Sequence, residues 1–146
     1  RPAITAEVGH TEQTTLGDLF TAILTPHLYF PEQFTLQAPP VELGVTAATS
    51  LALVLHELAT NASKYGALST AKGRLDVRGQ FDGDVLSLEW VETGGPSVSG
   101  PPGHQGFGSR LASMSIVGQL AGSIAFDWNE TGLVVRLTMA RERLLR

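Results

Sequence analysis

Residues 55–66 read Leu-His-Glu-Leu-Ala-Thr-Asn-Ala-Ser-Lys-Tyr-Gly, and this stretch decides the fold because it lies in the longest helix that the sequence predicts. The helix is predicted from Thr46 to about Tyr65, since this segment contains neither proline nor an internal glycine. Gly66 stands at its end, where a C-cap is expected. Its apolar stripe is formed by Leu51, Leu55, Leu58 and Ala62.

Three polar side chains share one face of this helix. At about 100° per residue, Glu57, Asn61 and Lys64 fall within about 60° of one another. The amide oxygen of Asn61 is a hard, neutral ligand that suits Mg²⁺. Lys64 can balance phosphate charge, and Glu57 can accept a proton or orient a water molecule. Taken alone, the same face is more often a solvated helix surface with a Glu57–Lys64 pair.

A second stretch, Trp90-Val91-Glu92-Thr93-Gly94-Gly95-Pro96, lies where a predicted strand enters a glycine-rich loop. A carboxylate at a strand end can accept a hydrogen bond from an exocyclic amine such as that of adenine. The glycines Gly94 and Gly95 would let a planar base approach the backbone closely. The alternative is an ordinary strand exit into a turn.

A third stretch, Gly106-Phe107-Gly108-Ser109-Arg110-Leu111, takes a glycine-containing loop directly into a predicted helix start. Free backbone N–H groups at a helix N-terminus favour phosphate, and Ser109 and Arg110 can add contacts. The dinucleotide-binding fingerprint is excluded, because Leu111 stands where its third glycine is needed. A capping turn without a ligand is the alternative.

The remaining pattern predicts an α/β two-layer sandwich, with a mixed, mostly antiparallel sheet and about three helices on one face. Asp82-Gly83 is a hairpin-turn signal between two strands. The tail 141–146 is predicted to be frayed or helical. The other predicted elements are a helix over 16–24 closed by Pro26, strands 33–37, 41–43, 74–81 and 85–91, a loop 93–108, a helix 109–120, and a closing hairpin of strands 123–128 and 132–139.

Composition sets further bounds on the class of protein. With 146 residues, 42% hydrophobic and 16% charged, the sequence predicts a single globular domain. The formal net charge of −4 argues against a general nucleic-acid binder. The absence of cysteine excludes disulfides, iron–sulfur clusters and thiolate zinc sites, and fits a cytoplasmic location. No apolar run in the sequence is long enough to span a bilayer, so we expect no membrane contact by this segment.

Taken together, the three motifs resemble the ATP-binding domain of the GHKL superfamily, and more narrowly the catalytic domain of the HWE subfamily of bacterial sensor histidine kinases. His56 matches the histidine of the subfamily's N-box. Trp90 and Glu92 match the Trp-x-Glu of its first glycine box, and residues 106–111 match its second glycine box. The resemblance spans about residues 16–139.

The resemblance implies ATP and Mg²⁺ as ligands. It implies that Asn61 holds the Mg²⁺ that bridges the phosphates, and that Glu92 recognises adenine in place of the family's usual aspartate. Glu57 would be a base or a water-orienting group. His56 has two open interpretations, orientation of Glu57 or packing as a neutral histidine. The other implied contacts are Lys64 and Tyr65 at phosphate or ribose, Gly94 and Gly95 around the base, and Gly106, Gly108, Ser109 and Arg110 near the phosphates at the end of a lid over residues 93–105.

The implied reaction is transfer of the γ-phosphoryl group of ATP to a histidine on a separate phosphoacceptor domain. None of His10, His27 and His104 lies in the His-Arg-x-x-Asn-like context of that acceptor. Because the sequence also opens with Arg1, we expect the dimerisation, phosphoacceptor and sensor domains to lie outside this fragment. A response regulator would then be the downstream partner. Alternatives are another GHKL ATPase, an anti-sigma-type serine kinase, or a degenerate domain that acts only as an interaction module.

Overall fold

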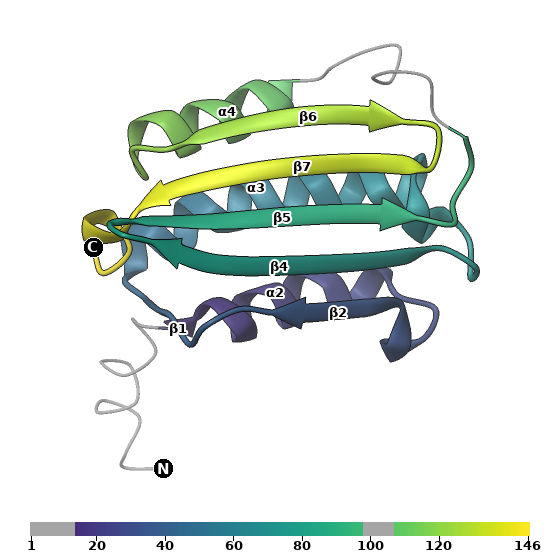
Figure 1. Ribbon diagram of the computed structural model, residues 1–146, viewed down its shortest axis with the longest axis horizontal. Helices are drawn as coiled ribbons and strands as arrows, with labels where there is room; N and C mark the ends of the chain where they lie inside the picture. Colours follow the sequence, from purple (N-terminus) through teal and green to yellow (C-terminus); the bar gives the residue numbers. More distant parts are fainter. Residues whose placement is uncertain (1–13, 98–106) are drawn as a thin grey trace.

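The protein has two layers, a five-stranded sheet and a set of α-helices that cover one face of it (Figure 1). The computed structural model describes residues 14–97 and 107–146, the side chains of residues 107–112 excepted. The elements of the two layers are α2 (Leu16–Leu24), β2 (Phe34–Gln37), α3 (Val45–Lys64), β4 (Arg74–Asp82), β5 (Val85–Thr93), α4 (Phe107–Gly118), β6 (Ser123–Asn129) and β7 (Gly132–Ala140).

The sheet is mixed and mostly antiparallel, as the sequence predicts. Its strand order is β2-β4-β5-β7-β6, and β2 pairs with β4 in parallel, while the other neighbours are antiparallel. Two hairpins, β4–β5 and β6–β7, supply four of its strands. The first turns at Gly83, whose φ of 61° is the left-handed conformation that glycine adopts without cost. A separate short pair joins β1 (Thr14–Thr15) to β3 (Glu42–Leu43).

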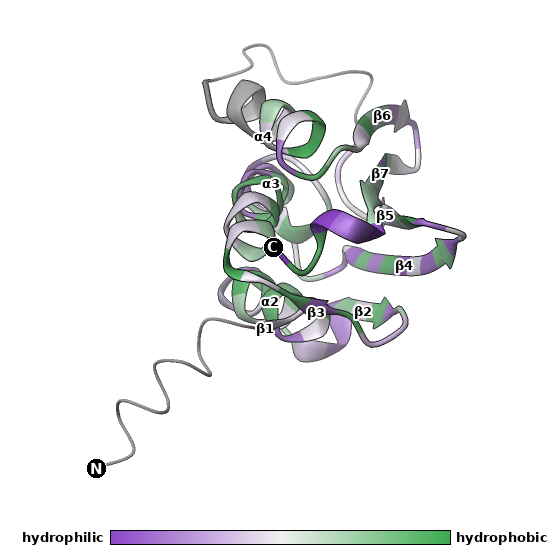
Figure 2. Cartoon of the chain, turned by 90° about the vertical axis from the view of Figure 1, so that its left-hand side faces the viewer, coloured by the Kyte–Doolittle hydropathy of each residue, from purple (hydrophilic) through white to green (hydrophobic). Residues whose placement is uncertain are grey.

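The period-two pattern of the strands decides which face is buried. Along β5 the side chains of Leu86, Leu88 and Trp90 are buried, whereas those between them are only partly buried. The apolar stripe of α3 meets this inner face, and Figure 2 shows hydrophobic colour where the helices and the sheet face each other. Among the described residues, Trp90 is the largest fully buried side chain, and it belongs to the main apolar cluster.

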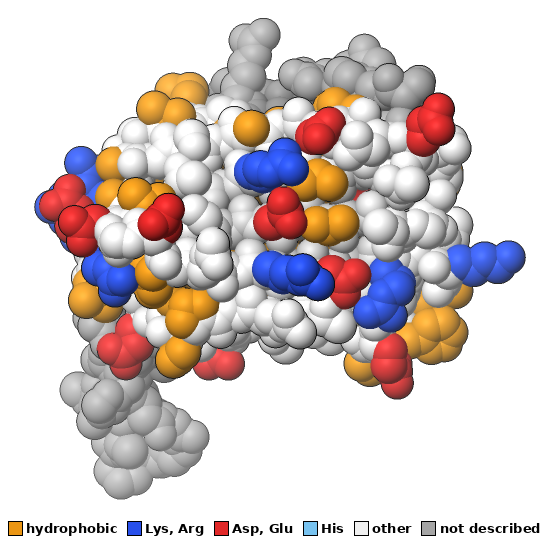
Figure 3. All heavy atoms as spheres, in the orientation of Figure 1, with side chains coloured by type: hydrophobic (Ala, Val, Ile, Leu, Met, Phe, Trp, Pro, Cys, Tyr) orange, Lys and Arg blue, Asp and Glu red, His pale blue; other side chains and the backbone are white. Residues whose placement is uncertain are grey.

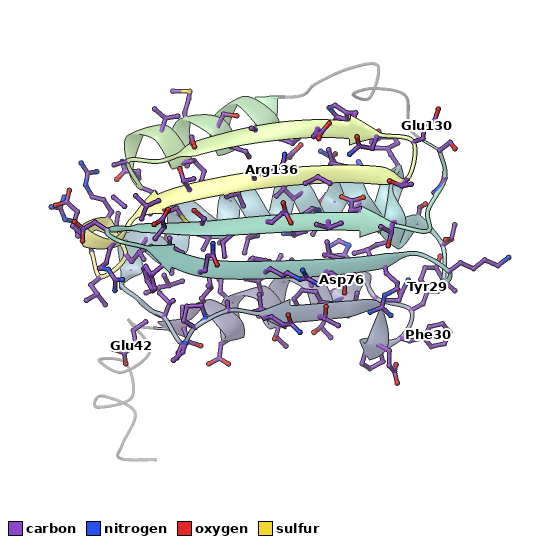
Figure 4. The ribbon with its side chains drawn as sticks, in the orientation of Figure 1. Tyr29, Phe30, Glu42, Asp76, Glu130 and Arg136 are labelled. Carbon is purple, nitrogen blue, oxygen red and sulfur yellow. The ribbon has the colours of Figure 1, made fainter. Side chains whose placement is uncertain are left out.

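The outer face of the sheet is charged and open to solvent (Figure 3). Arg136 on β7 lies between two carboxylates, with its Nε 3.4 Å from Glu89 Oε2 and its Nη1 3.9 Å from Asp127 Oδ2. Arg74 and Asp76 pair at 3.3 Å on β4, and Figure 4 shows Asp76 and Arg136 on this side of the ribbon. These pairs are largely exposed, so they contribute little to the free energy of unfolding.

The C-terminal tail forms an ordered turn, and the frayed alternative is wrong. Residues Arg141–Arg143 form a 3₁₀ turn, and Leu144 is buried in the main core. The carbonyl of Leu144 accepts from Gly44 N at 2.8 Å, and that of Arg146 accepts from Thr46 N at 2.9 Å. Because the first N–H groups of a helix lack partners within it, the tail satisfies donors at the start of α3.

Several predicted boundaries shift by one or two residues. Helix α3 begins at Val45 and ends at Lys64, close to the predicted range. Helix α4 begins at Phe107, two residues before the predicted start at Ser109. Across residues 14–97 and 107–146, no helix is long and apolar enough to cross a membrane.

Candidate functional site

The carboxyl group of Glu92 is the centre of the candidate site. The alternation of β5 places it on the helix-facing side, where only 3% of the residue is exposed. The indole N–H of Trp90 donates to Glu92 Oε2 at 2.8 Å, and the backbone N–H of Ala67 donates to Oε1 at 3.1 Å. Each carboxylate oxygen can accept two hydrogen bonds, so the group retains acceptor capacity for a further donor.

Burial dominates the electrostatics of this group. It raises the pKa of Glu92 above the ordinary value of 4.5, while the hydrogen bonds from Trp90 and Ala67 lower it in part. A buried carboxylate that is only partly compensated gains from an additional hydrogen-bond donor, because such a donor stabilises the charged form. The site is therefore chemically matched to a ligand that presents N–H groups.

Gly66 lies directly against this carboxylate. Its φ of −112° is outside the left-handed region, and the C-cap of α3 is Tyr65, so the prediction of Gly66 as the C-cap is wrong. A Cβ atom at residue 66 would lie 2.1 Å from Glu92 Oε1 and 3.2 Å from Ala62 Cα. Glycine is needed here because the chain leaving the helix passes too close to the carboxylate for any side chain.

The glycines after β5 bring backbone against backbone. Gly94 has a φ of 75°, and a Cβ there would lie 2.9 Å from the carbonyl oxygen of Lys72. A Cβ at Gly95 would lie 2.7 Å from Ala67 Cα. These contacts fix the loop beside Gly66 and Ala67. The backbone packing alone therefore explains why both positions are glycine, whether or not a base binds there.

Glu57 and Asn61 form a polar pair on α3, one turn apart. Asn61 Nδ2 donates to Glu57 Oε2 at 3.3 Å, and both residues are half-buried. This assignment directs the amide oxygen of Asn61 away from the carboxylate, as a metal ligand requires. No group of three His, Cys, Asp or Glu in the part of the chain that the structure describes could hold a metal ion. A Mg²⁺ bound at Asn61 would need phosphate or water oxygens to complete its shell.

The remaining predicted residues of α3 lie at its surface. Lys64 is exposed, and Tyr65 is 43% exposed at the C-terminal end of the helix. His56 is exposed as well, so its interpretation as a packed histidine is wrong. Because a helix turns about 100° per residue, His56 also points to a different side from Asn61.

The second glycine box is only partly described. Gly106 and most of the predicted lid lie outside the described residues. Gly108, Ser109 and Arg110 belong to the first turn of α4, whose initial N–H groups have no partner within the helix. The backbone thus has the form expected of a phosphate-binding helix start.

The sequence did not indicate the contacts that two residues make at the site. Ala67 and Gly66 approach Glu92 across 25 and 26 positions of sequence, and no local pattern reports such a contact. The hydrogen bond between Trp90 and Glu92 could have been predicted from the sequence, because residues two apart on a strand share a face.

The two-layer architecture, a mixed five-stranded sheet with helices on one face, matches the fold of histidine kinase catalytic domains. A solved histidine kinase domain from Erythrobacter litoralis EL346 superposes with a TM-score of 0.69 at 21% identity, covering 89% of this chain and 62% of that one. The catalytic domain of the histidine kinase ThkA superposes with a TM-score of 0.64 at 15% identity, over 88% of this chain and 95% of that one.

Sequence comparison gives the relationship more closely. The chain is 41% identical over 132 residues to blue-light-activated histidine kinase 1 of Erythrobacter litoralis, and 35% identical over 131 residues to a blue-light-activated histidine kinase of Brucella anthropi. It spans 36% of the first relative's length and 26% of the second's. No protein-family model matches it. This segment is thus similar in sequence to part of these kinases, and its fold is that of histidine kinase catalytic domains.

Proposed function

We propose that this domain binds ATP and acts as the catalytic domain of a sensor histidine kinase of the HWE type. The observation that carries the proposal is the Glu92 carboxylate, because the residue is only 3% exposed and two donors hold its oxygens. The chain that carries it is 41% identical to a histidine kinase over 132 residues. An ionised carboxylate offers only acceptors, and so suits the exocyclic amine of adenine.

Most of the candidate site residues have a role in this proposal. Glu92 accepts from the adenine amine, and the close-packed backbone of Gly94 and Gly95 borders the base. Asn61 is the protein ligand for a Mg²⁺ that, when bound, neutralises phosphate charge and orients the transferring group. Glu57 holds the Asn61 amide through its hydrogen bond. The other proposed phosphate or ribose contacts are Lys64, Tyr65, Gly106, Gly108, Ser109 and Arg110.

The chemical step is in-line transfer to an imidazole nitrogen. A bond forms between that nitrogen and Pγ, the bond from Pγ to the bridging oxygen breaks, and ADP leaves with the electron pair. A neutral imidazole nitrogen already has a lone pair, so the domain contributes mainly position and charge neutralisation. The acceptor is a histidine on a phosphoacceptor domain of the longer parent protein. We also propose a response regulator in the cytoplasm as the downstream partner. Residues 93–105 are proposed to form the lid of the nucleotide site.

The first test is a thermal shift with Mg-ATP, on wild type and Asn61→Ala. At about 100 times the dissociation constant, a ligand stabilises by roughly 2.7 kcal/mol, which is roughly 5–10 °C in melting temperature for a domain of this size. We expect this shift in wild type and a much smaller one in Asn61→Ala. Thr49→Ala, exposed three turns earlier on the same helix, is the control and keeps the full shift.

Two results would count against the proposal. No shift in wild type at millimolar ATP would favour a degenerate interaction module. Acid-stable phosphate on the full-length parent after incubation with labelled ATP would indicate a serine or threonine acceptor, because phosphohistidine is acid-labile.

A further inference from the structure

Gly66 touches the group proposed to recognise the base, yet it belongs to a different motif. It follows the last turn of α3, whereas Glu92 is the next-to-last residue of β5. Its backbone angles do not demand glycine, since its φ is −112°. Glycine is needed for lack of space, because a Cβ atom at residue 66 would lie 2.1 Å from Glu92 Oε1 and 3.3 Å from Glu92 Cδ.

The carboxylate cannot move aside without a loss. The oxygen that faces Gly66 is Oε1, the same oxygen that accepts from Ala67 N. The other oxygen is tied to the buried indole of Trp90 at 2.8 Å. A side chain at residue 66 would therefore push Oε1 off its donor and turn the whole carboxylate. Its remaining acceptor positions would then point in a different direction from the one they have now.

We propose that Gly66 is a positioning residue for nucleotide selectivity, because it leaves the room that a glutamate, rather than a shorter acid, needs to meet the base in one fixed orientation. This inference rests on the proposed function. A carboxylate held in this way accepts from the amine of adenine and repels the carbonyl oxygen that guanine carries at the equivalent position. Gly66 thus sets the preference for ATP over GTP without itself contacting either.

The length of the acid supplies a sharp test. Aspartate is one methylene shorter, so Glu92→Asp withdraws the carboxylate from residue 66. Gly66→Ala should then weaken ATP binding when residue 92 is glutamate, and should have little effect on it when residue 92 is aspartate. A double-mutant cycle measures this coupling directly, because the two residues touch.

The experiment measures dissociation constants for Mg-ATP and Mg-GTP by calorimetry in wild type, Gly66→Ala, Glu92→Asp and the double variant. Displacing a hydrogen-bonded charged group is expected to weaken ATP binding about 10-fold to 100-fold in Gly66→Ala, and to narrow the ATP/GTP ratio. In the Glu92→Asp background, Gly66→Ala should change ATP affinity by less than about threefold. Gly17→Ala is the matched control, since nothing lies within 4 Å of a Cβ at that helical glycine.

A second readout guards against simple misfolding. The Trp90 indole N–H signal in a ¹H–¹⁵N spectrum reports its bond to Glu92, and Gly66→Ala should shift it while amide signals of the outer sheet stay in place. Wild-type ATP affinity in Gly66→Ala, or equal effects of that change in both backgrounds, would overturn the inference alone. Failure of the wild type to bind ATP would overturn the proposed function and this inference together.

Discussion

Glu92 is neutralised more easily than an exposed glutamate, because burial raises its pKa above 4.5 despite the bonds from Trp90 and Ala67. In the unfolded chain the same group titrates near its ordinary value. Between the pKa of Glu92 in the unfolded chain and its raised pKa in the folded protein, the folded protein holds a proton that the unfolded chain has lost. The contribution of Glu92 to the free energy of unfolding is therefore full below pH 4.5 and is lost as the pH rises through the raised pKa.

This sign leads to a prediction for Glu92→Gln, which is neutral at every pH. The difference in free energy of unfolding between wild type and Glu92→Gln should drift against wild type as the pH rises from 4.5 through the raised pKa of Glu92. Urea denaturation at several pH values measures it. Glu42→Gln removes an exposed carboxylate and serves as the control. Parallel pH profiles for wild type and Glu92→Gln would show that burial does not perturb the group.

At this scale the sequence predicted the candidate residues of the site but only part of their geometry. The helical period put Glu57 and Asn61 on one face of a helix, and Glu92 was predicted at the end of a strand beside a glycine-rich loop. The close approach of Gly66 to Glu92 was not found, since it depends on how the chain leaves α3, which no helical or strand period describes. Gly66 was assigned to a helix cap for the same reason, because a glycine after a helix has several physical causes.

At the scale of elements, the start of α3 depends on the C-terminal turn. Leu144 is 3% exposed, and its carbonyl accepts from Gly44 N at 2.8 Å. The main elements were largely predictable, because the longer helices and strands show an apolar period and the hairpins carry turn residues. The turn at 141–146 was left open, since a short basic tail has no period, and only its packing against α3 orders it.

Leu144→Ala is expected to lower the free energy of unfolding by about 2–4 kcal/mol, the usual cost of a buried leucine with the cavity it leaves. The adjacent Leu145→Ala is the matched control, because Leu145 is 64% exposed and should change stability by less than about 0.5 kcal/mol. Urea denaturation of both variants measures the two values. Equal effects would mean that the turn does not pack on α3 in solution.

At the scale of the molecule, the two faces of one sheet differ in how much they stabilise the fold. Adjacent residues of β7 show this, since Arg136 lies on the charged outer face and Leu137 is 1% exposed on the inner face. The architecture was predicted correctly as a mixed sheet with helices on one side. The pairing of outer charges was not, because it depends on which strands are neighbours in the order β2-β4-β5-β7-β6.

Arg136→Gln should cost less than about 1 kcal/mol although it breaks two ion pairs, because exposed pairs are screened by water and salt. Leu137→Ala, one position along the same strand, should cost about 2–5 kcal/mol. Thermal and urea denaturation at low and high salt compare them. A loss on Arg136→Gln that matches the loss on Leu137→Ala would indicate that the outer face is covered and desolvated.

The contact between Gly66 and Glu92 also has a consequence for how such domains diverge. A side chain at residue 66 and a glutamate at residue 92 exclude each other, so neither position is able to drift alone. Lineages that keep the longer acid should keep the glycine, and those that shorten it to aspartate are released to accept larger residues. Covariation of these two alignment columns, twenty-six positions apart, would record that steric rule across the family.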